Sequence, residues 1–152
     1  MNDRYLFKAK GKNWQELPKD EQWVTGTIMY IENKCMMLIE DEENLLRVHY
    51  LDDEMWSADI YAIEVDESTI CQCTGLKDKN GKLIWENDIV RDKKGNCYKA
   101  FWQNNYYQFS WICVKSEIFL IGAKWDLWSI KSYEIEVIGN RFDNPELLES
   151  EE

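Results

Sequence analysis

The chain has 152 residues and a formal net charge of −11, and 14% of its residues are aromatic, including eight Trp and eight Tyr. At this length we expect one domain over residues 1–152 with a large core, because each buried aromatic side chain removes about 150–250 Å² of surface from water. No apolar run approaches the roughly 20 residues that cross a bilayer, and no apolar signal segment follows Met1, so we expect a cytoplasmic protein without a membrane contact.

The first half of the chain has the composition of short strands separated by polar turns. Residues 1–20 predict an N-terminal arm with a short edge strand at Tyr5–Phe7, anchored by Trp14 and Leu17. β-branched and aromatic residues then predict strands over residues 23–31, 35–39 and 45–50, the last two joined by an acidic hairpin loop. Gly26 inside the first of these strands indicates a bulge or a close backbone approach.

The most distinctive stretch runs from Cys71 to Val90 and predicts two strands joined by a polar turn. The pair Asn80-Gly81 is a strong signal for a tight turn, and Gly75 allows a sharp bend before it. Short polar residues that can bond to turn amides then separate two apolar groups: Glu86, Asn87 and Asp88.

The last third predicts strands over residues 97–102, 106–114 and 133–138, with turns at 92–96 and 103–105. Alternate residues of the second of these strands form an aromatic-rich stripe, for which core packing is the commoner explanation than base stacking: Tyr107, Phe109, Trp111 and Cys113. Short apolar segments at 118–121 and 125–130 have no evident partner strand.

Asn144 and Pro145 are an N-cap and a first helical residue, so they predict one helical turn, followed by an acidic tail at residues 149–152. Many short strands separated by turns favour a mainly β fold. We expect either a barrel or paired antiparallel sheets, with one or two short helices.

No catalytic, cofactor or metal site is expected. The odd number of cysteines, in a chain without an export signal, predicts reduced and buried thiols at Cys35, Cys71, Cys73, Cys97 and Cys113. Cys71 and Cys73 would share one face of a strand, but a zinc site needs further paired ligands. We expect His49 to be a surface or cross-strand residue, and the Asp52-Asp53-Glu54 run to be a solvated loop.

The net charge is distributed unevenly along the chain. Residues 77–99 carry seven basic and four acidic side chains, a net +3, whereas the remainder carries 11 basic and 25 acidic side chains, a net −14. Because phosphate contacts dominate nucleic-acid affinity, the overall sign argues against direct nucleic-acid binding. The central segment instead predicts a basic interaction surface formed by Lys77, Lys79, Lys82, Arg91, Lys93 and Lys94.

Three parts of the sequence resemble motifs of the YopX-like phage and prophage proteins. They are Thr74–Lys82 followed by Glu86-Asn87-Asp88-Ile89-Val90, Trp23-Val24-Thr25-Gly26, and Val137-Ile138-Gly139-Asn140 followed by Asp143–Leu148. Asn87 stands where this family usually has glycine, and asparagine also tolerates the positive φ that such a turn requires. The resemblance implies a phage-related, mainly β protein of a family without a known activity. Its motif residues are assigned structural roles: Gly75, Asn80, Gly81, Asn87, Asp88, Gly139, Asn140 and Pro145.

The residues and the resemblance together predict a non-enzymatic accessory protein that binds another macromolecule in the bacterial cytoplasm. The acidic composition leaves open a decoy that mimics DNA and occupies a host nucleic-acid-binding protein. A metal-dependent hydrolase using Asp52, Asp53 and Asp88 is a further alternative. Oppositely charged segments and abundant Trp and Tyr also favour a homo-oligomer.

Overall fold

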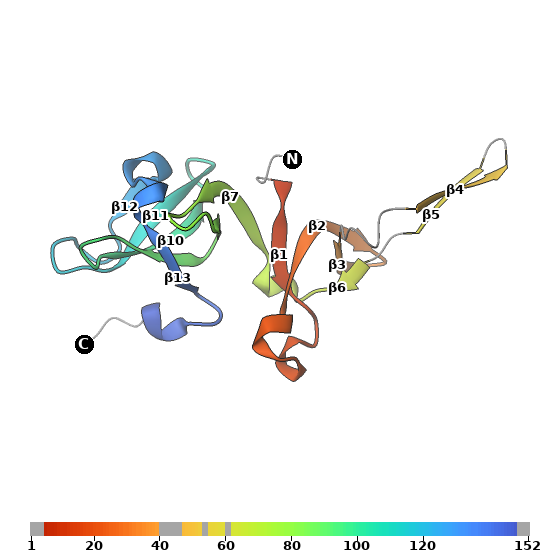
Figure 1. The fold of residues 1–152 in the computed structure, drawn as a ribbon, viewed down its shortest axis with the longest axis horizontal. Coiled ribbons are helices and arrows are strands. Elements are labelled where there is room, and N and C mark those ends of the chain that lie inside the picture. The colour runs from red at the N-terminus through yellow and green to blue at the C-terminus, as the bar shows by residue number, and fades with distance from the viewer. Residues whose placement is uncertain (1–4, 40–46, 53–54, 60–61, 149–152) are drawn as a thin grey trace. The chain divides into compact units, whose positions relative to one another are not determined.

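The computed structural model describes residues 5–39, 47–52, 55–59 and 62–148, of which 47–52 and 55–59 are described by their backbone alone. The chain divides into two compact units (Figure 1). The N-terminal unit comprises the described residues of Tyr5–Ile70, and the C-terminal unit comprises those of Cys71–Glu152. No described helix exceeds four residues, so the predicted mainly β fold is confirmed. Among these residues no helix is long and apolar enough to cross a bilayer.

The N-terminal unit contains an antiparallel sheet whose strands follow the order β6-β3-β2-β1 (Figure 1). These strands are β1 (Phe7–Lys10), β2 (Trp23–Ile31), β3 (Lys34–Leu38) and β6 (Ala62–Glu64). Three 3-10 turns accompany them: η2 (Trp14–Glu16), η3 (Lys19–Glu21) and η4 (Glu67–Thr69). The bounds of β2 are those that the sequence predicts.

Two further strands of this unit, β4 (Arg47–Asp52) and β5 (Met55–Asp59), pair with each other. The predicted hairpin between the strand at 35–39 and a return strand at 45–50 is therefore wrong, because β3 pairs with β2 and β6 instead. The local signals of the two segments do not specify a partner, and in the structure each finds a different one. The predicted acidic loop at residues 40–44 lies outside the described residues.

A small apolar core in the N-terminal unit forms around Ala9, Cys35, Met37 and Val65. Beside it Lys10 is only 1% exposed, an unusual position for a charged side chain. Its Nζ donates to Gln22 Oε1 at 3.1 Å and lies 3.8 Å from the centre of the Trp14 ring. A hydrogen-bond acceptor and aromatic faces replace part of the lost hydration of the ammonium group.

Gly26 on β2 lies against the neighbouring strand. A Cβ atom added at this position would overlap the backbone carbonyl oxygen of Leu38, so the predicted close backbone approach is confirmed. At Gly11, by contrast, an added Cβ atom would meet nothing within 4 Å.

We expect Gly26→Ala to lower the free energy of unfolding by about 1–3 kcal/mol, because a backbone atom cannot move aside as a flexible side chain does. Gly11→Ala is the matched control, since its methyl group has open space. Chemical denaturation of both variants would test this. Equal stabilities of the two variants would contradict the close approach.

The C-terminal unit combines the hairpin of β7 (Cys71–Lys77) and β8 (Leu83–Trp85) with a five-stranded antiparallel sheet. The order of that sheet is β12-β11-β10-β9-β13. Its strands are β12 (Lys124–Asp126), β11 (Gln108–Lys115), β10 (Cys97–Gln103), β9 (Asp88–Arg91) and β13 (Glu136–Asn140). The end strands β12 and β13 do not pair with each other, so the sheet is open and the barrel alternative is not confirmed.

Three 3-10 turns complete this unit: η5 (Leu127–Ser129), η6 (Ser132–Glu134) and η7 (Pro145–Leu148). The last of them is the helical turn predicted after Asn144. The core lies between the β7–β8 hairpin and the sheet, and contains Ile84, Val90, Tyr98, Ala100, Trp111, Cys113 and Ile135. Core packing is therefore confirmed for Trp111 and Cys113 of the predicted aromatic-rich stripe.

The stripe does not include Tyr107, because the turn between β10 and β11 lies at residues 104–107 and not at 103–105. Tyr107 is 83% exposed and has a φ of 51°. A bulky residue in this left-handed region is strained, whereas asparagine is favoured there.

Replacement of Tyr107 by Asn should raise the free energy of unfolding by about 0.5–1 kcal/mol, because the strain is relieved and little buried surface is lost. Tyr106→Asn is the control, since Tyr106 is also exposed but lies outside the positive-φ region. Thermal unfolding of both variants measures the difference. A Tyr107→Asn variant that melts below the wild type would refute this explanation.

Candidate interaction site

The β7–β8 turn is held by the carboxylate of Asp78, which is 5% exposed. Asp78 Oδ1 accepts hydrogen bonds from the backbone N–H groups of Asn80 (2.8 Å) and Lys82 (2.9 Å), and Oδ2 accepts one from Val137 (3.0 Å). Burial by itself would raise the pKa of Asp78, but these three donors outweigh it and lower the pKa below its usual range. One side chain thus fastens the hairpin turn to β13.

Glycines with positive φ lie on either side of this acid, Gly75 at 82° and Gly81 at 79°. Asn87 has a φ of 69°, the left-handed conformation expected where the related motif has glycine. Its backbone N–H donates to Ala100 O at 2.8 Å. The next residue, Asp88, is 2% exposed, and its Oδ2 accepts from the Trp85 N–H at 2.8 Å.

The closing motif is a second hydrogen-bonded turn. Asn140 Oδ1 accepts from the backbone N–H groups of Phe142 (2.9 Å) and Asp143 (3.0 Å), directly before Pro145 begins η7. A Cβ atom at Gly139 would overlap the side chain of Asn144. The residues of both motifs therefore act on the backbone geometry of the C-terminal unit.

The β9–β10 turn repeats the arrangement with Asp92. Its Oδ1 accepts from the backbone N–H groups of Lys94 (2.9 Å) and Asn96 (3.0 Å), and its Oδ2 accepts from Asn96 Nδ2 (2.8 Å) and the Tyr98 hydroxyl (3.1 Å). Burial opposes ionisation of Asp92, yet these donors lower its pKa. Burial and the adjacent carboxylate raise the pKa of Tyr98, so its hydroxyl stays protonated and donates.

A polar relay connects this turn to the loop between β11 and β12. Ser116 Oγ donates to Asn96 Oδ1 at 2.7 Å and accepts from the backbone N–H groups of Ile118 (3.0 Å) and Phe119 (2.9 Å). At the other end of the loop, Gly122 has a φ of 87° and its N–H donates to Cys113 O at 2.8 Å. Both ends of the loop are therefore fixed by hydrogen bonds.

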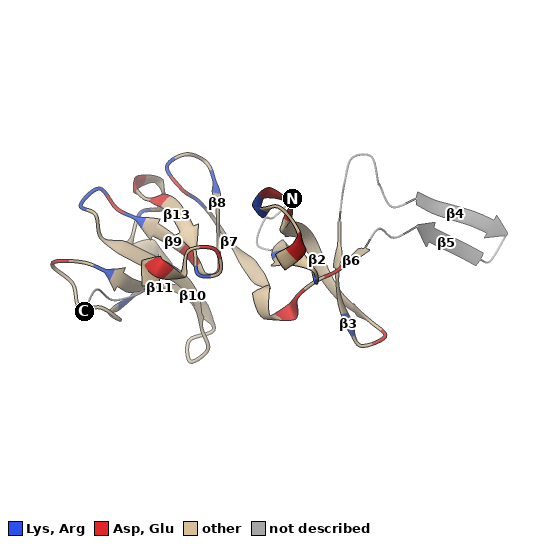
Figure 2. Ribbon diagram, turned by 90° about the horizontal axis from the view of Figure 1, so that it is seen from below, with Lys and Arg blue, Asp and Glu red and all other residues tan. Residues whose placement is uncertain are grey.

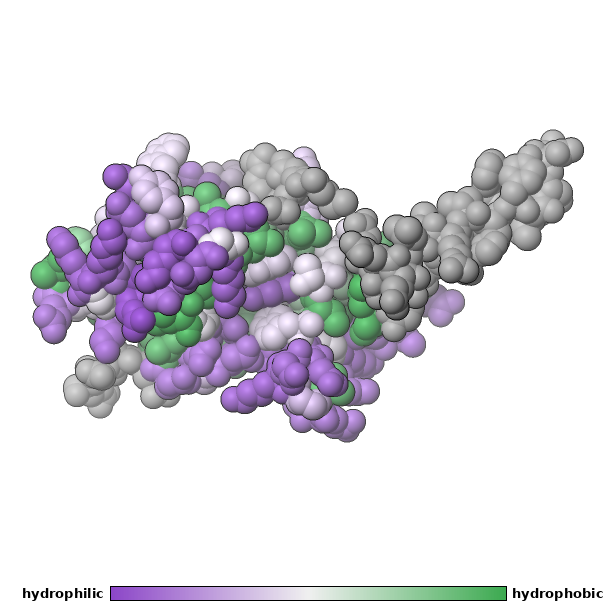
Figure 3. Space-filling view, viewed as in Figure 1, coloured by the Kyte–Doolittle hydropathy of each residue, from purple (hydrophilic) through white to green (hydrophobic). Residues whose placement is uncertain are grey.

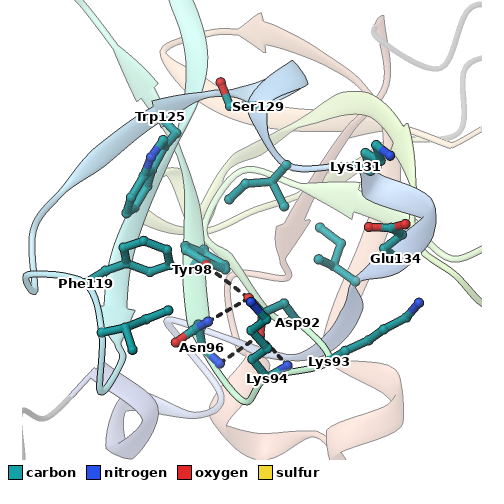
Figure 4. A pocket seen from close by; sticks show the side chains of 13 residues that line it. Asp92, Lys93, Lys94, Asn96, Tyr98, Phe119, Trp125, Ser129, Lys131 and Glu134 are labelled. Carbon is teal, nitrogen blue, oxygen red and sulfur yellow. Dashed lines mark hydrogen bonds between the residues drawn. The ribbon is translucent and has the colours of Figure 1, made fainter.

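A pocket with a volume of about 390 Å³ lies between this loop, the β9–β10 turn and the η5–η6 region. Figure 4 shows Tyr98, Phe119 and Trp125 together on one side, with Lys93, Lys131 and Glu134 opposite them. Ile118, Ile130 and Ile135 are also part of the lining, together with Asp92, Lys94, Asn96 and Ser129. The pocket thus joins an apolar wall to a mainly basic rim.

The surface beside the pocket is unusually apolar. Four consecutive residues of the loop, Ile118–Ile121, are each at least 40% exposed, and Trp128 on η5 is 82% exposed. Figure 3 shows apolar residues at the surface of the C-terminal unit among hydrophilic ones. We call Ile118–Ile121, in the loop between β11 and β12, the apolar loop.

The six predicted surface residues separate into groups. Lys93 and Lys94 line the pocket, whereas the side chains of Lys79 and Arg91 both lie against Glu136, at 3.2 and 3.4 Å. Lys77 and Lys82 are exposed but do not line the pocket. Figure 2 shows basic residues of this unit both in its turns and on its strands.

Several pocket residues were not identified from the sequence, notably Phe119, Trp125 and Lys131. Their segments were recognised only as apolar stretches without a partner. The available signal was the run of four apolar residues Ile118–Ile121 directly before Gly122. Its apolar residues follow neither the two-residue period of a strand nor the 3.6-residue period of a helix.

All five cysteines are buried, and burial raises the pKa of the Cys35, Cys97 and Cys113 thiols. Within the described part of the chain, no three His, Cys, Asp or Glu side chains are grouped so as to hold a metal ion. The side chains of His49 and Asp52, and all of Asp53, lie outside the described residues.

Asp78→Asn should lower the free energy of unfolding at neutral pH by about 1–3 kcal/mol, because an amide cannot accept all three backbone hydrogen bonds. The folded pKa of Asp78 is depressed, so its stabilisation is present above the unfolded pKa of about 3.9 and is lost as the pH falls through the folded pKa. The stability difference between wild type and variant should therefore shrink in acid. Denaturation from pH 7 down to pH 2 measures it, with the exposed Glu117→Gln as control. A pH-independent difference would contradict the assignment.

The comparisons with known proteins agree with the motifs. A family model described as YopX protein matches residues 18–149. The fold is similar to that in the crystal structure of protein EF1440 from Enterococcus faecalis, with a TM-score of 0.51, 22% sequence identity, and coverage of 94% of this chain and 96% of that chain. No curated protein sequence matches the chain. Because the family model spans most of the sequence, the chain belongs to the YopX family.

Proposed function

We propose that this YopX family member is a non-enzymatic phage or prophage accessory protein that binds another protein in the bacterial cytoplasm. The observation that carries the proposal is the apolar loop, which is exposed although its ends are fixed by hydrogen bonds. Exposed apolar patches of this kind mark interaction sites. Because the loop is already ordered, less conformational entropy is lost when a partner binds.

The chemistry of the pocket supports binding more than catalysis. Asp92 and Glu134 are the carboxylates of its lining, and both oxygens of Asp92 accept hydrogen bonds from Asn96 and other groups of the same region. A general base needs a free lone pair directed at the substrate. Asp88, one of the carboxylates considered for a hydrolase, is buried and accepts from a backbone N–H.

The acidic decoy is a second candidate, favoured by the distribution of charge. Residues 5–70 carry six basic and 15 acidic side chains, a net −9, whereas residues 71–148 carry 11 basic and ten acidic side chains, a net +1. Some of these acids are engaged within the unit, since Glu64 pairs with Lys12 and Asp66 accepts from Ser68. We therefore rank the decoy hypothesis below the binding of a partner protein at the pocket.

Affinity capture from lysogenic or infected cells, followed by mass spectrometry, tests the proposal. We expect a protein that is captured by the wild type, lost with Phe119→Asp and retained with Tyr107→Asp. Both substitutions place a carboxylate at an exposed aromatic position of the C-terminal unit, but only Phe119 lines the pocket. Cooperative thermal unfolding of Phe119→Asp close to that of the wild type would exclude misfolding as the cause.

Other outcomes separate the alternatives. A partner lost only when Glu16 and Glu21, which are exposed acids of the N-terminal unit, are changed to Lys would favour the decoy. Capture of an untagged copy of the same chain would identify the partner as a homo-oligomer. No partner dependent on Phe119 would overturn the assignment of the pocket.

A further inference from the structure

The apolar part of the pocket is shaped to surround a side chain. The Trp125 ring meets Tyr98 at an interplanar angle of 90° and Phe119 at 69°, with ring centres 5.6 and 5.2 Å apart. Such edge-to-face rings form a corner, and three isoleucines line the same pocket. A volume of about 390 Å³ is within the range of specific ligand sites. The corner therefore suits one aliphatic or aromatic side chain.

The charged part of the pocket has an excess of free cations. The Asp92 carboxylate is occupied by its own turn, which leaves Glu134 as the other acid of the lining against Lys93, Lys94 and Lys131. In the described part of the chain, Lys93 and Lys94 form no ion pair. These ammonium groups are available to pair with carboxylates of a ligand.

A second hollow of about 300 Å³ adjoins the pocket at Trp125. Trp125 and Ser129 line both, and the second is otherwise polar, with Gln103, Gln108 and Asp126 among its residues. Gln108 Nε2 donates to Asp126 Oδ1 at 2.6 Å, and Gln103 Oε1 accepts from Ser110 Oγ at 2.9 Å. Within the described residues this leaves Gln103 Nε2 and Gln108 Oε1 to pair with the C=O and N–H groups of an extended backbone.

From these observations, and building on the proposed function, we infer that the pocket binds an extended acidic peptide segment of a partner protein. One apolar side chain of that segment occupies the corner formed by Tyr98, Phe119 and Trp125. Acidic residues beside it pair with the Lys93, Lys94 and Lys131 side chains.

A single-stranded nucleic acid also carries negative charge, but the pocket is less suited to it. Bases stack on open aromatic faces, whereas the three rings here stand at steep angles and are accompanied by isoleucines. The net charge of −11 would also repel a polyanion along its length. A short acidic segment meets only the local basic rim.

Fluorescence anisotropy with three labelled synthetic peptides tests the inference. The first has a central leucine flanked by Asp and Glu, the second replaces the leucine by glycine, and the third replaces the acids by lysine. We expect the full-length protein to bind the first peptide at least about tenfold more tightly than either other. The affinity should also fall with rising salt, since part of it is electrostatic.

A matched pair of charge-reversal variants locates the site. Lys93→Glu with Lys94→Glu should weaken binding of the first peptide at least about tenfold. Lys77→Glu with Lys82→Glu makes the same charge change on the same unit outside the pocket lining, and should leave the affinity within about twofold.

Equal weakening by both variants would show unspecific attraction and overturn the inference. Tighter binding of oligothymidylate than of the first peptide would overturn it in favour of a nucleic acid. Absence of binding by the first peptide would overturn the acidic-segment assignment, while a captured partner that depends on Phe119 would still uphold the proposed function. Tighter binding of the lysine peptide than of the first peptide would also overturn the acidic-segment assignment.

Discussion

The Asp78 carboxylate is the contact on which the rest of the C-terminal unit depends, because it binds backbone N–H groups of a hairpin turn and of a distant strand at once. Two more acids act in a similar way. Asp88 accepts from the backbone N–H of Trp85, which precedes it, and Asp92 accepts from the backbone N–H groups of Lys94 and Asn96, which follow it. A buried backbone N–H without a partner costs about 1–3 kcal/mol, so each acid offsets a penalty that the tight turns would otherwise create. Part of the acidic composition of this chain is therefore structural, and these carboxylates are poorly placed for catalysis.

The sequence predicts those parts of the fold that local chemistry determines. Strand β2, the Asn80-Gly81 turn and the turn after Asn144 follow from residues adjacent in the chain. The partners of strands are a different matter: β3 pairs with β6, which comes after β4 and β5 in the chain, and no local pattern encodes that contact. The basic half of the pocket was partly foreseen, at Lys93 and Lys94, because charge density is visible in a sequence. The aromatic half was not, because Tyr98, Phe119 and Trp125 meet only when β10, the apolar loop and β12 are folded together.

Apolar side chains are mostly buried in folded proteins, and among the described residues the apolar loop is the main exception. Its exposure has a physical reason in the relay from Asp92 through Asn96 to Ser116, which satisfies the backbone N–H groups of Ile118 and Phe119 at the surface. With those groups bonded locally, the loop gains no hydrogen bonds by moving inward, and Gly122 turns the chain directly into β12. The same relay positions one wall of the pocket. The fold and the candidate site thus depend on the same polar contacts, and loss of the contacts between Asp92, Asn96 and Ser116 would affect both.

An acidic partner for an acidic protein requires that attraction be local. Charges further apart than about 8–10 Å are largely screened at physiological ionic strength, so a ligand at the pocket responds mainly to Lys93, Lys94 and Lys131. The N-terminal unit, with a net −9 over residues 5–70, repels the same ligand wherever it approaches that unit. Attraction at one place and repulsion elsewhere restrict an acidic segment to one site more effectively than a uniformly basic surface would. For the proposed acidic segment, the uneven charge would therefore determine specificity more than affinity, and the apolar corner beside Trp125 would supply the remaining binding energy.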